Sequence, residues 1–412
     1  MNFTMLPSLI ALAALAVLFR AILHQSTSER VGLWLTGWIL VLVHSVAQFV
    51  DTGQGLWSRL ATAVSLNTLE AASVAFLLSF SPVATDRRRQ FLLGAGIGVP
   101  AIVFTDAVIG GITSHIFYYV LIALALVLAL LVIWNFYRKT TPYVVGLWIG
   151  CLVVTGGIAW AVGRGQPDLG IICLLAAFNF IIAALFWRRF ERVTVGVVTT
   201  IVSFVAWGAV FPIATALAAF APSVHIESEA WNIPLYFVAV GMTLILLEDQ
   251  VQRSDYLADH DELTGLPNRR LLEDRLKHAL ARADRKGNKV AVLLLDFDRF
   301  KEINDTYGHR IGDLALQQMV IRLASRIRVS DTLARTGGDE FTVVSDVADA
   351  EGAHVLISSL ETAFIVPFKI EGKLIRAGLS IGLALYPDDG RTTDELHAAA
   401  DHAMYVCKRG QR

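Results

Sequence analysis

Long apolar runs in the first 250 residues constrain this chain more than any other feature of its sequence. Nine runs are long enough, or nearly so, to cross about 30 Å of hydrocarbon as helices. They lie near residues 5–24, 31–50, 60–80, 91–109, 116–136, 143–163, 169–187, 195–220 and 231–247. The last run is short, so eight spans with a re-entrant segment is the alternative count. The sequence therefore predicts an α-helical polytopic membrane domain over residues 1–247.

The distribution of charge divides the chain into two parts. Residues 1–250 hold 12 Lys or Arg and 11 Asp or Glu, whereas residues 251–412 hold 23 and 25. This contrast predicts a soluble domain after the membrane domain. The net charge of −1 leaves no basic excess to displace counterions from a phosphate backbone, so we expect no nucleic-acid partner. The three cysteines show no paired or metal-ligand spacing, which favours packing roles.

Basic residues in the expected loops predict the orientation. The odd-numbered connections between apolar runs hold ten Lys or Arg, and the even-numbered ones hold two. By the positive-inside rule the odd loops are cytoplasmic, so the N-terminus lies outside and nine spans bring residue 248 inside. No Lys or Arg precedes Arg20, so we expect the first run to be a retained span rather than a cleaved signal peptide.

One acidic residue, Glu70, lies well inside an expected span. A carboxyl group inside a membrane is a functional-site hypothesis by default. The polar residues that could contact it are His44, Gln48, Asn67 and Asn179. The alternative interpretation is a protonated Glu70 that hydrogen-bonds to a neighbouring helix.

Residues 248–260 are expected to link the two domains as a helix. No Pro or Gly interrupts this segment, so the last span can continue beyond the membrane. Apolar and small residues from Leu244 to Ala258 recur at a spacing of three or four, which is typical of a short coiled-coil seam. A plain solvated helix is the alternative. The expected soluble domain then covers residues 261–412.

A motif near the C-terminus points to chemistry. It reads Arg335-Thr-Gly-Gly-Asp339-Glu340-Phe-Thr-Val-Val. The two glycines allow a tight turn and let a ligand approach without a Cβ in the way. Two acids follow on the turn, and an apolar strand anchors them. A hairpin of this kind can hold carboxylates against a metal-bound phosphate.

Further motifs precede this one. They read Asp261-Glu-Leu-Thr-Gly-Leu-Pro-Asn-Arg-Arg, then Val290-Ala-Val-Leu-Leu-Leu-Asp296-Phe-Asp298, then Tyr307-Gly-His-Arg-Ile-Gly-Asp313. With these motifs in this order and at this spacing, residues 255–412 resemble the GGDEF family, the diguanylate cyclases, which make cyclic di-GMP from two GTP molecules. The resemblance does not extend to residues 1–250.

The expected secondary structure fits the resemblance. The patterns predict a helix over 268–286, a strand over 289–297, a hairpin over 332–345 and a strand over 374–386. Mixed helices and strands around a hairpin make an α+β domain. The resemblance implies a central sheet like that of polymerase palms and nucleotidyl cyclases. It also implies a homodimer for catalysis. Together with the apolar runs and the loop charges, it predicts a multi-pass protein of the bacterial inner membrane with the GGDEF domain in the cytoplasm.

The resemblance also implies a metal site for Mg²⁺ or Mn²⁺. Its ligands would be Asp296, Asp339 and the carbonyl of Phe297. Glu340 would help the attacking hydroxyl to lose its proton, or hold a second metal. Asp296 ends the most apolar strand of the domain, so a strand-end cap is its alternative role. Asp298 has its own alternative role, as N-cap of a helix that begins at Arg299.

Substrate-binding residues follow from the same resemblance. Backbone N–H groups around Phe300 and Lys301 would seat a phosphate at a helix start. Asn304 and Asp313 would read guanine, because Asp accepts hydrogen bonds that adenine does not offer. The remaining expected contacts are Gly338 beside the base, and Lys408 and Arg412 on the phosphates. Gln411 stands where the family usually has a glycine.

A second binding site is implied by the sequence Arg328-Val-Ser-Asp331, nine residues before the glycine pair. The family carries an inhibitory site for cyclic di-GMP at this offset, so Arg328 and Asp331 would bind the product. A surface ion pair is the alternative.

Three functions are compatible with these observations. The first is an active, membrane-tethered diguanylate cyclase that works as a two-fold dimer. The second is a catalytically weak domain that acts as a receptor for cyclic di-GMP or GTP. The third is a transporter regulated by its tail, against which the sequence shows no clear internal repeat.

Overall fold

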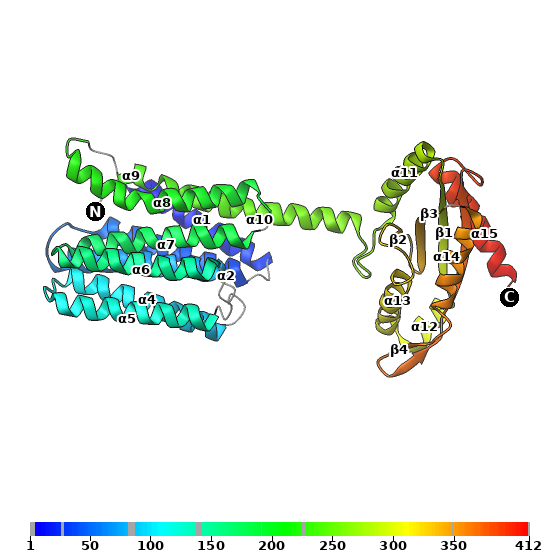
Figure 1. Ribbon diagram of the computed structural model, residues 1–412, viewed down its shortest axis with the longest axis horizontal. Coiled ribbons are helices and arrows are strands. Elements are labelled where there is room, and N and C mark those ends of the chain that lie inside the picture. The colour runs from blue at the N-terminus through cyan, green and yellow to red at the C-terminus, as the bar shows by residue number, and fades with distance from the viewer. Residues whose placement is uncertain are drawn as a thin grey trace. The chain divides into compact units, whose positions relative to one another are not determined.

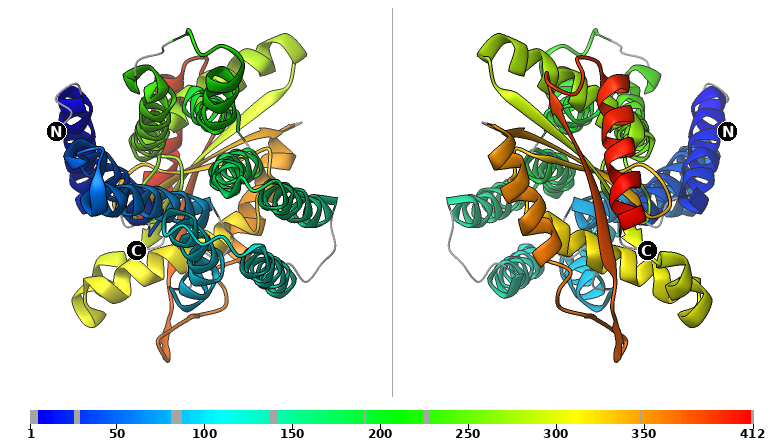
Figure 2. Two further views of the ribbon diagram at one scale, coloured as in Figure 1. Left: turned by 90° about the vertical axis from the view of Figure 1, so that its left-hand side faces the viewer. Right: turned by 90° about the vertical axis from the view of Figure 1, so that its right-hand side faces the viewer.

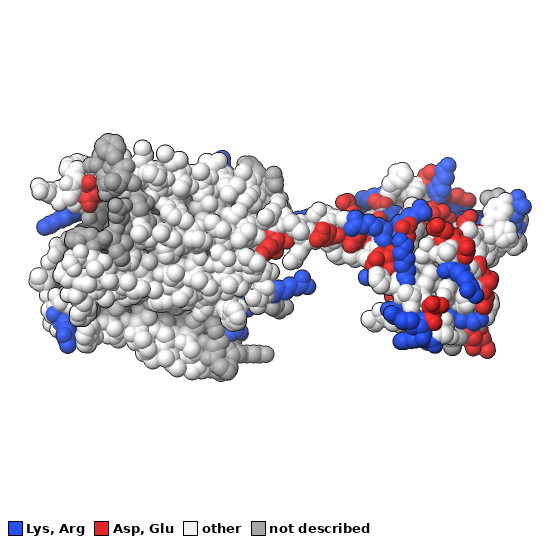
Figure 3. All heavy atoms as spheres, turned by 90° about the horizontal axis from the view of Figure 1, so that it is seen from above, with Lys and Arg blue, Asp and Glu red and all other residues white. Residues whose placement is uncertain are grey.

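The chain folds into two compact units, Met1–Glu248 and Asp249–Arg412 (Figure 1). The computed structural model describes residues 5–25, 29–80, 87–136, 142–190, 192–224, 228–347 and 349–410. Seen as spheres, the N-terminal unit is almost free of charged side chains on the face shown, whereas acidic and basic side chains cover the C-terminal unit (Figure 3). This contrast follows the division of charge in the sequence.

The N-terminal unit is helical throughout its described residues. Its helices are α1 (Leu6–Gln25), α2 (Glu29–Val50), α3 (Gly55–Phe80), α4 (Arg87–Ile109), α5 (His115–Phe136), α6 (Pro142–Gly163), α7 (Pro167–Arg189), α8 (Val195–Phe220), α9 (Ser228–Trp231) and α10 (Ile233–Asp259). Each of the nine apolar runs lies on one of these helices. Seven of the described helices are long and apolar enough to cross a membrane, while Leu6–Ile22 and His115–Leu131 are shorter apolar segments. The expected helices are therefore confirmed, but the count of nine spans is not.

The acid inside the bundle hydrogen-bonds to a neighbouring helix. Glu70 on α3 is fully buried, and its Oε1 accepts a hydrogen bond from Thr105 Oγ1 on α4 at 2.5 Å. One turn away, Asn67 Nδ2 donates to Asp106 Oδ1 at 2.8 Å. His44 bonds instead to Ser65 at 2.9 Å. These contacts match the alternative in which Glu70 serves helix packing.

The end of the N-terminal unit is held by a cap between two helices. Glu248 on α10 accepts hydrogen bonds from Thr194 Oγ1 at 2.5 Å and from the Gly196 N–H at 3.1 Å. Thr194 is the N-cap of α8, and Gly196 lies in its first turn, where N–H groups have no helical partner. The carboxylate also complements the positive end of the helix dipole. Glu248 therefore fixes α10 against α8, and α10 continues without a break to Asp259.

The C-terminal unit is an α+β domain. Its elements are α11 (Arg269–Lys286), β1 (Lys289–Asp298), α12 (Phe300–Tyr307), α13 (His309–Ala324), β2 (Thr332–Arg335), β3 (Glu340–Val347), α14 (Ala350–Thr362), β4 (Phe368–Ile370), β5 (Lys373–Ile375), β6 (Gly378–Tyr386) and α15 (Thr393–Gly410). Four strands form an antiparallel sheet in the order β2-β3-β1-β6, and β4 and β5 form a separate hairpin. The strand expected over 374–386 is wrong in its extent, because β5 ends at Ile375 and β6 begins at Gly378.

Alternating side chains of β1 divide the core into two layers. Leu293, Leu295 and Phe297 pack with residues of α12, α13 and α14. Val290 and Val292 pack with residues of α11 and α15 on the other face. Successive side chains of a strand point to opposite faces. The even-numbered Asp296 therefore lies on the face covered by α11 and α15.

Helix α15 approaches the sheet closely because β6 carries a glycine. A Cβ at Gly382 would overlap the carbonyl oxygen of Ala400 and the backbone nitrogen of Met404. Only a residue without a side chain allows the two backbones this contact. In the right-hand view of Figure 2, α15 runs alongside the strands. The contact brings the last turns of α15, including Lys408, over the end of β1.

We predict that Gly382→Ala displaces α15 and destabilises the C-terminal unit. The added methyl group meets backbone atoms that cannot rotate away, and overpacking of this kind costs about 1–3 kcal/mol. The change should lower the melting temperature and speed hydrogen exchange in α15. Gly352→Ala is the control, since its Cβ would make only ordinary van der Waals contacts, with Asp349 and Val347. Equal melting temperatures for the two variants would contradict the prediction.

Candidate functional site

The candidate site lies at the end of β1 where three strands meet. Asp296 pairs with Glu340 of β3 on one side and with Ser380 of β6 on the other. Cross-strand partners share a face of the sheet. Asp296 and Glu340 are far apart in the sequence, but their carboxyl groups therefore lie at neighbouring positions on the sheet.

The loop between β2 and β3 brings Asp339 to the same place. The N–H groups of Thr336 and Gly337 donate to the carbonyl of Glu340 at 3.0 and 3.3 Å. The N–H of Phe297 donates to the carbonyl of Asp339 at 3.3 Å. This last bond ties the loop to β1 directly after Asp296. The structure thus brings together all three residues for which the sequence predicts metal binding.

The two glycines of the loop are not needed for backbone conformation, and only Gly337 is constrained by space within the domain. Neither Gly337 nor Gly338 has a positive φ angle. A Cβ at Gly337 would lie 2.7 Å from Glu340 Oε2. A Cβ at Gly338 would meet nothing within 4 Å. The surface beside Gly338 is therefore open.

Lys408 is the cation of the site. Its Nζ lies 2.7 Å from Asp296 Oδ1, and the exposed fractions of the two side chains are 38% and 14%. Burial raises the pKa of Asp296, and the negative charges of Asp339 and Asp298 act in the same direction, while the hydrogen bond and charge of Lys408 oppose it. The folded protein thus holds several carboxylates close together and stabilises them only in part.

The oxygen atoms of Asp296, Asp339 and Phe297 are suitable ligands for a hard divalent cation. Among the described residues no three His, Cys, Asp or Glu side chains form a ready metal cluster. The expected site instead combines the carboxylates of Asp296 and Asp339 with the carbonyl of Phe297. Oxygen donors of this kind suit Mg²⁺, which is commonly held by one or two carboxylates together with phosphate oxygens of the substrate. The ammonium group against Asp296 shows that positive charge is stabilised at this position.

Arg335 braces the loop, a role that the sequence did not reveal. Its guanidinium donates to the carbonyl of Gly338 at 3.1 and 2.7 Å, and to both oxygens of Asp261 at 2.8 and 3.0 Å. Thr264 also donates to Asp261 through its N–H and its hydroxyl. Burial opposes ionisation of Asp261, but the hydrogen bonds from Thr264 and Arg335 lower its pKa overall. The ion pair between Arg335 and Asp261 joins the first and last motifs of the domain. The presence of both motifs was the only feature of the sequence that pointed to this contact.

The start of α12 differs from the sequence-based expectation. Asp298 is not its N-cap, because its Oδ1 accepts a hydrogen bond from Ser380 Oγ at 2.6 Å. The cap residue is Arg299, with φ 59° in the left-handed region and no side-chain cap. Such backbone conformations in non-glycine residues cluster at functional sites. The first turn of α12, at Phe300 and Lys301, is therefore not capped by the side chain of its N-cap residue.

Two expected guanine-binding residues lie on adjacent helices. Asn304 on α12 packs so closely on Gly312 that a Cβ there would overlap Asn304 Oδ1. Asp313 follows on α13 and is exposed. Gly312 therefore sets the separation between Asn304 and the helix that carries Asp313.

The expected inhibitory residues form a closed turn. Asp331 Oδ2 accepts from the N–H of Arg328 at 2.9 Å, and its Oδ1 accepts from Ser345 Oγ at 2.9 Å. The Arg328 side chain is exposed. Asp331 thus has a structural part in this turn, whereas Arg328 faces solvent. Arg412 and Gln411 lie outside the described residues.

Comparisons with known proteins place the C-terminal unit in a family. Residues 258–412 match the model of the diguanylate cyclase GGDEF domain. The chain is 45% identical over 152 residues to the bifunctional diguanylate cyclase/cyclic di-GMP phosphodiesterase MucR of Pseudomonas aeruginosa, covering 37% of this chain and 22% of MucR. It is 38% identical over 187 residues to the cyclic di-GMP phosphodiesterase PdeR of Escherichia coli, covering 45% of this chain and 28% of PdeR.

A solved structure of a GGDEF domain is similar to this chain in sequence. A truncated form of TpbB from P. aeruginosa that comprises only the GGDEF domain is 41% identical, with 37% of this chain and 89% of that chain covered and a TM-score of 0.36. The family assignment therefore rests on sequence identity and not on the similarity of the folds. Residues 258–412 belong to the GGDEF family and have diguanylate cyclase homologues. The chain spans about a quarter of the length of MucR and PdeR, and its N-terminal helical region is unassigned.

We predict that Arg335→Lys destabilises the C-terminal unit by about 1–3 kcal/mol. Lysine cannot bridge Gly338 and Asp261 with a planar fork of donors. Thermal unfolding of the purified protein measures the loss. Arg269→Lys is the matched control, because the Arg269–Glu273 pair is exposed, with fractions of 78% and 46%. A loss no larger than that of the control would show that the brace is dispensable.

A second prediction concerns the raised pKa of Asp296. A carboxyl group whose pKa is raised by folding costs stability when it is ionised, and the cost disappears as the pH falls through the raised value. At neutral pH, Asp296→Asn should therefore leave the melting temperature unchanged or higher without divalent ions. We expect Mn²⁺ to raise the melting temperature of the wild type, and Asp296→Asn should abolish that increase. Asp401→Asn, an exposed acid on α15, should keep that increase.

Proposed function

We propose that this chain is a membrane-bound diguanylate cyclase, which condenses two GTP molecules into cyclic di-GMP and releases pyrophosphate. The observation that carries the proposal is the meeting of Asp296, Asp339 and Lys408 at the end of β1. Two acids and a cation at one point suit phosphoryl transfer, which depends on positioning and on charge stabilisation. The diguanylate cyclase homologues support the same activity.

In the proposed reaction, the 3′-hydroxyl of one GTP attacks the α-phosphate of the other. A bond from the 3′-oxygen to phosphorus forms, the bond to pyrophosphate breaks, and the hydroxyl proton leaves. Asp296, Asp339 and the carbonyl of Phe297 would hold a Mg²⁺ or Mn²⁺ ion, which neutralises phosphate charge. Glu340 is exposed beside the site and would accept the proton, or assist a second ion.

Substrate binding is assigned to groups around the same loop. The first turn of α12, at Phe300 and Lys301, would seat a phosphate through backbone N–H groups. Asn304 and Asp313 would bind the guanine edge, with the base against the open side of Gly338. Lys408 would move from Asp296 to the phosphates when the metal binds. Arg412 is proposed as a second phosphate contact.

The proposal includes a homodimer and a membrane orientation. Each domain holds one GTP, so two domains must face each other for the two bonds to form. The positive-inside bias of the loops supports an N-terminus outside and the GGDEF domain in the cytoplasm of a bacterial inner membrane, where GTP is available. Nine spans satisfy this orientation. The unbroken helix α10 would transmit movements of the membrane domain.

We also propose product inhibition at Arg328. The exposed guanidinium suits a phosphate of cyclic di-GMP. Each oxygen of Asp331 already accepts one hydrogen bond, and guanine would use the acceptor capacity that remains.

The alternative is a catalytically weak domain that binds GTP or cyclic di-GMP as a receptor. Its support is that relatives such as PdeR are named as phosphodiesterases. The retained Asp296, Asp339 and glycine pair favour the cyclase.

The purified protein should convert GTP to cyclic di-GMP in the presence of Mg²⁺, measured by mass spectrometry. Asp339→Ala should abolish product, because half of the expected metal-binding carboxylates is gone. Asp346→Ala is the control, since it removes an exposed acid near the other end of β3. Arg328→Ala should continue at product levels that stop the wild type. GTP binding without any product would favour the receptor, and full activity of Asp339→Ala would contradict the metal assignment.

A further inference from the structure

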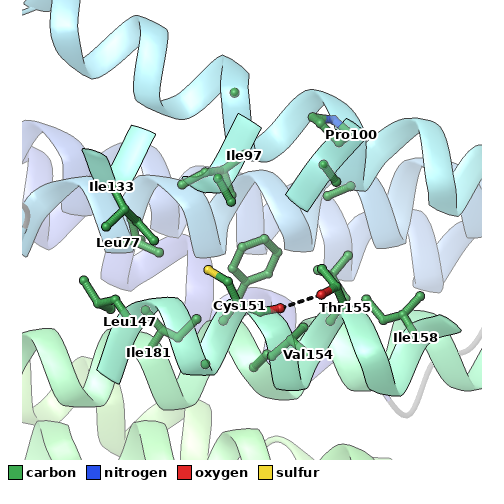
Figure 4. A pocket seen from close by; sticks show the side chains of 18 of the residues that line it. Leu77, Ile97, Pro100, Ile133, Leu147, Cys151, Val154, Thr155, Ile158 and Ile181 are labelled. Atoms are coloured by element: carbon green, nitrogen blue, oxygen red, sulfur yellow. Dashed lines mark hydrogen bonds between the residues drawn. The ribbon is translucent and has the colours of Figure 1, made fainter. Parts of the chain in front are cut away.

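The N-terminal unit contains a cavity of about 510 Å³ among its helices. Its walls come from α3, α4, α5, α6 and α7, with α4 and α6 on facing sides (Figure 4). Binding sites for small molecules typically measure about 300–1,000 Å³. The cavity is therefore large enough for a ligand, and nothing in the proposed cyclase reaction uses it.

Small residues create this space. Gly96 on α4 and Gly146 and Gly150 on α6 line the cavity. A Cβ at either glycine of α6 would meet nothing within 4 Å. Pro100, inside α4, also lines it and has no N–H to donate to the carbonyl of Gly96, which loosens the helix at this point. The local sequence of α4 and α6 thus prevents the helices from filling the gap.

The lining offers few partners for a polar ligand. None of the described lining residues carries a formal charge. The hydroxyl of Thr155 donates to the carbonyl of Cys151 at 2.7 Å, as the dashed line in Figure 4 shows. Water enters a cavity only where it finds two to four polar partners, and apolar cavities stay dry. An unfilled cavity forfeits dispersion contacts along its lining. A hydrocarbon occupant restores them.

The cavity is elongated along the helices. Its lining on α6 runs from Gly146 to Ile158, which is about 18 Å at 1.5 Å per residue. On α4 it runs from Leu93 to Phe104, or about 16 Å. The hydrocarbon core of a bilayer is about 30 Å thick, so one lipid chain extends about 15 Å. The length of the cavity therefore matches one chain.

One end of the cavity lies beside basic residues. Leu185, at this end, is one turn from Arg188 and Arg189 on α7. Leu93 lies five residues from Arg88 on α4. Helices α4 to α7 alternate in direction, so these residues occupy the same end of the bundle. Arginines at such a position attract anionic headgroups.

We propose that this cavity binds the hydrocarbon chain of an anionic amphiphile, whose acidic headgroup lies at the end marked by Arg88, Arg188 and Arg189. The same chemistry is offered by a free long-chain fatty acid and by an anionic phospholipid. The proposal assumes that the helices cross a membrane, and it does not depend on cyclase activity.

Photolabelling of the full-length protein in nanodiscs tests the proposal. Three probes carry a diazirine on the chain: a long-chain fatty acid, a phosphatidylglycerol and a fatty alcohol. We expect an acidic probe to label lining residues such as Ile97 and Val154, identified by peptide mass spectrometry. The probe that labels them, fatty acid or phospholipid, identifies the source of the chain.

Variants separate a bound chain from lipid at the outer surface. Gly150→Leu fills the cavity and should lower labelling of the lining about tenfold, while Gly156→Leu on the exposed face of the same helix should not. Gly146→Leu is a second filling variant in case the first fails to fold. Arg189→Gln should weaken labelling by the acidic probes but not by the alcohol.

Two results would overturn the proposal. Labelling that is spread over outward-facing residues such as Leu152 and Val153, and is unchanged by both filling variants, would mean contact with surrounding lipid only. Equal labelling by the alcohol and the acids, unaffected by Arg189→Gln, would remove the role of the headgroup.

Discussion

The pairing of β1 with a strand on each side is the constraint on which the candidate site depends. Leu293 and Leu295 are almost fully buried on one face and Val290 and Val292 on the other, so a slip of β1 by one residue would exchange the two core layers and bury Asp296 beneath α12, α13 and α14. This register places Asp296 opposite Glu340 and beside the loop that carries Asp339. The acids are therefore held together by apolar packing, because their own charges repel.

Long-range polar contacts then complete the arrangement. Arg335 joins the loop to Asp261, and Lys408 reaches Asp296 from a helix that Gly382 allows to approach. Each contact offsets negative charge or fixes a backbone group at the site. The site accordingly combines a rigid sheet with a few charged side chains whose partners lie more than seventy residues away.

The N-terminal unit follows a different principle. Most of its buried polar side chains donate to carbonyls of their own helix, as Ser73, Asn179 and Thr200 do. A few contacts, such as Thr105–Glu70 and Trp34–Ser79, join two helices. Glu248 closes the first turn of α8 and so anchors α10 at the end of the unit. Between α4 and α6, by contrast, glycines and a proline leave space that no side chain fills. The unit is therefore tightly joined at α10 and loosely packed around its cavity.

The sequence alone determined the helical N-terminal region, the α+β character of the C-terminal unit and the motifs that hold Asp296 and Asp339. These features are local: they depend on apolar periodicity, on charge density and on residue types at short spacing. The tertiary structure alone decided the brace between Arg335 and Asp261, the bond between Lys408 and Asp296, the role of Asp298 toward Ser380 and the cavity between α4 and α6. Each of these features depends on which distant segments pack together, and the local sequence around a residue does not specify those long-range contacts.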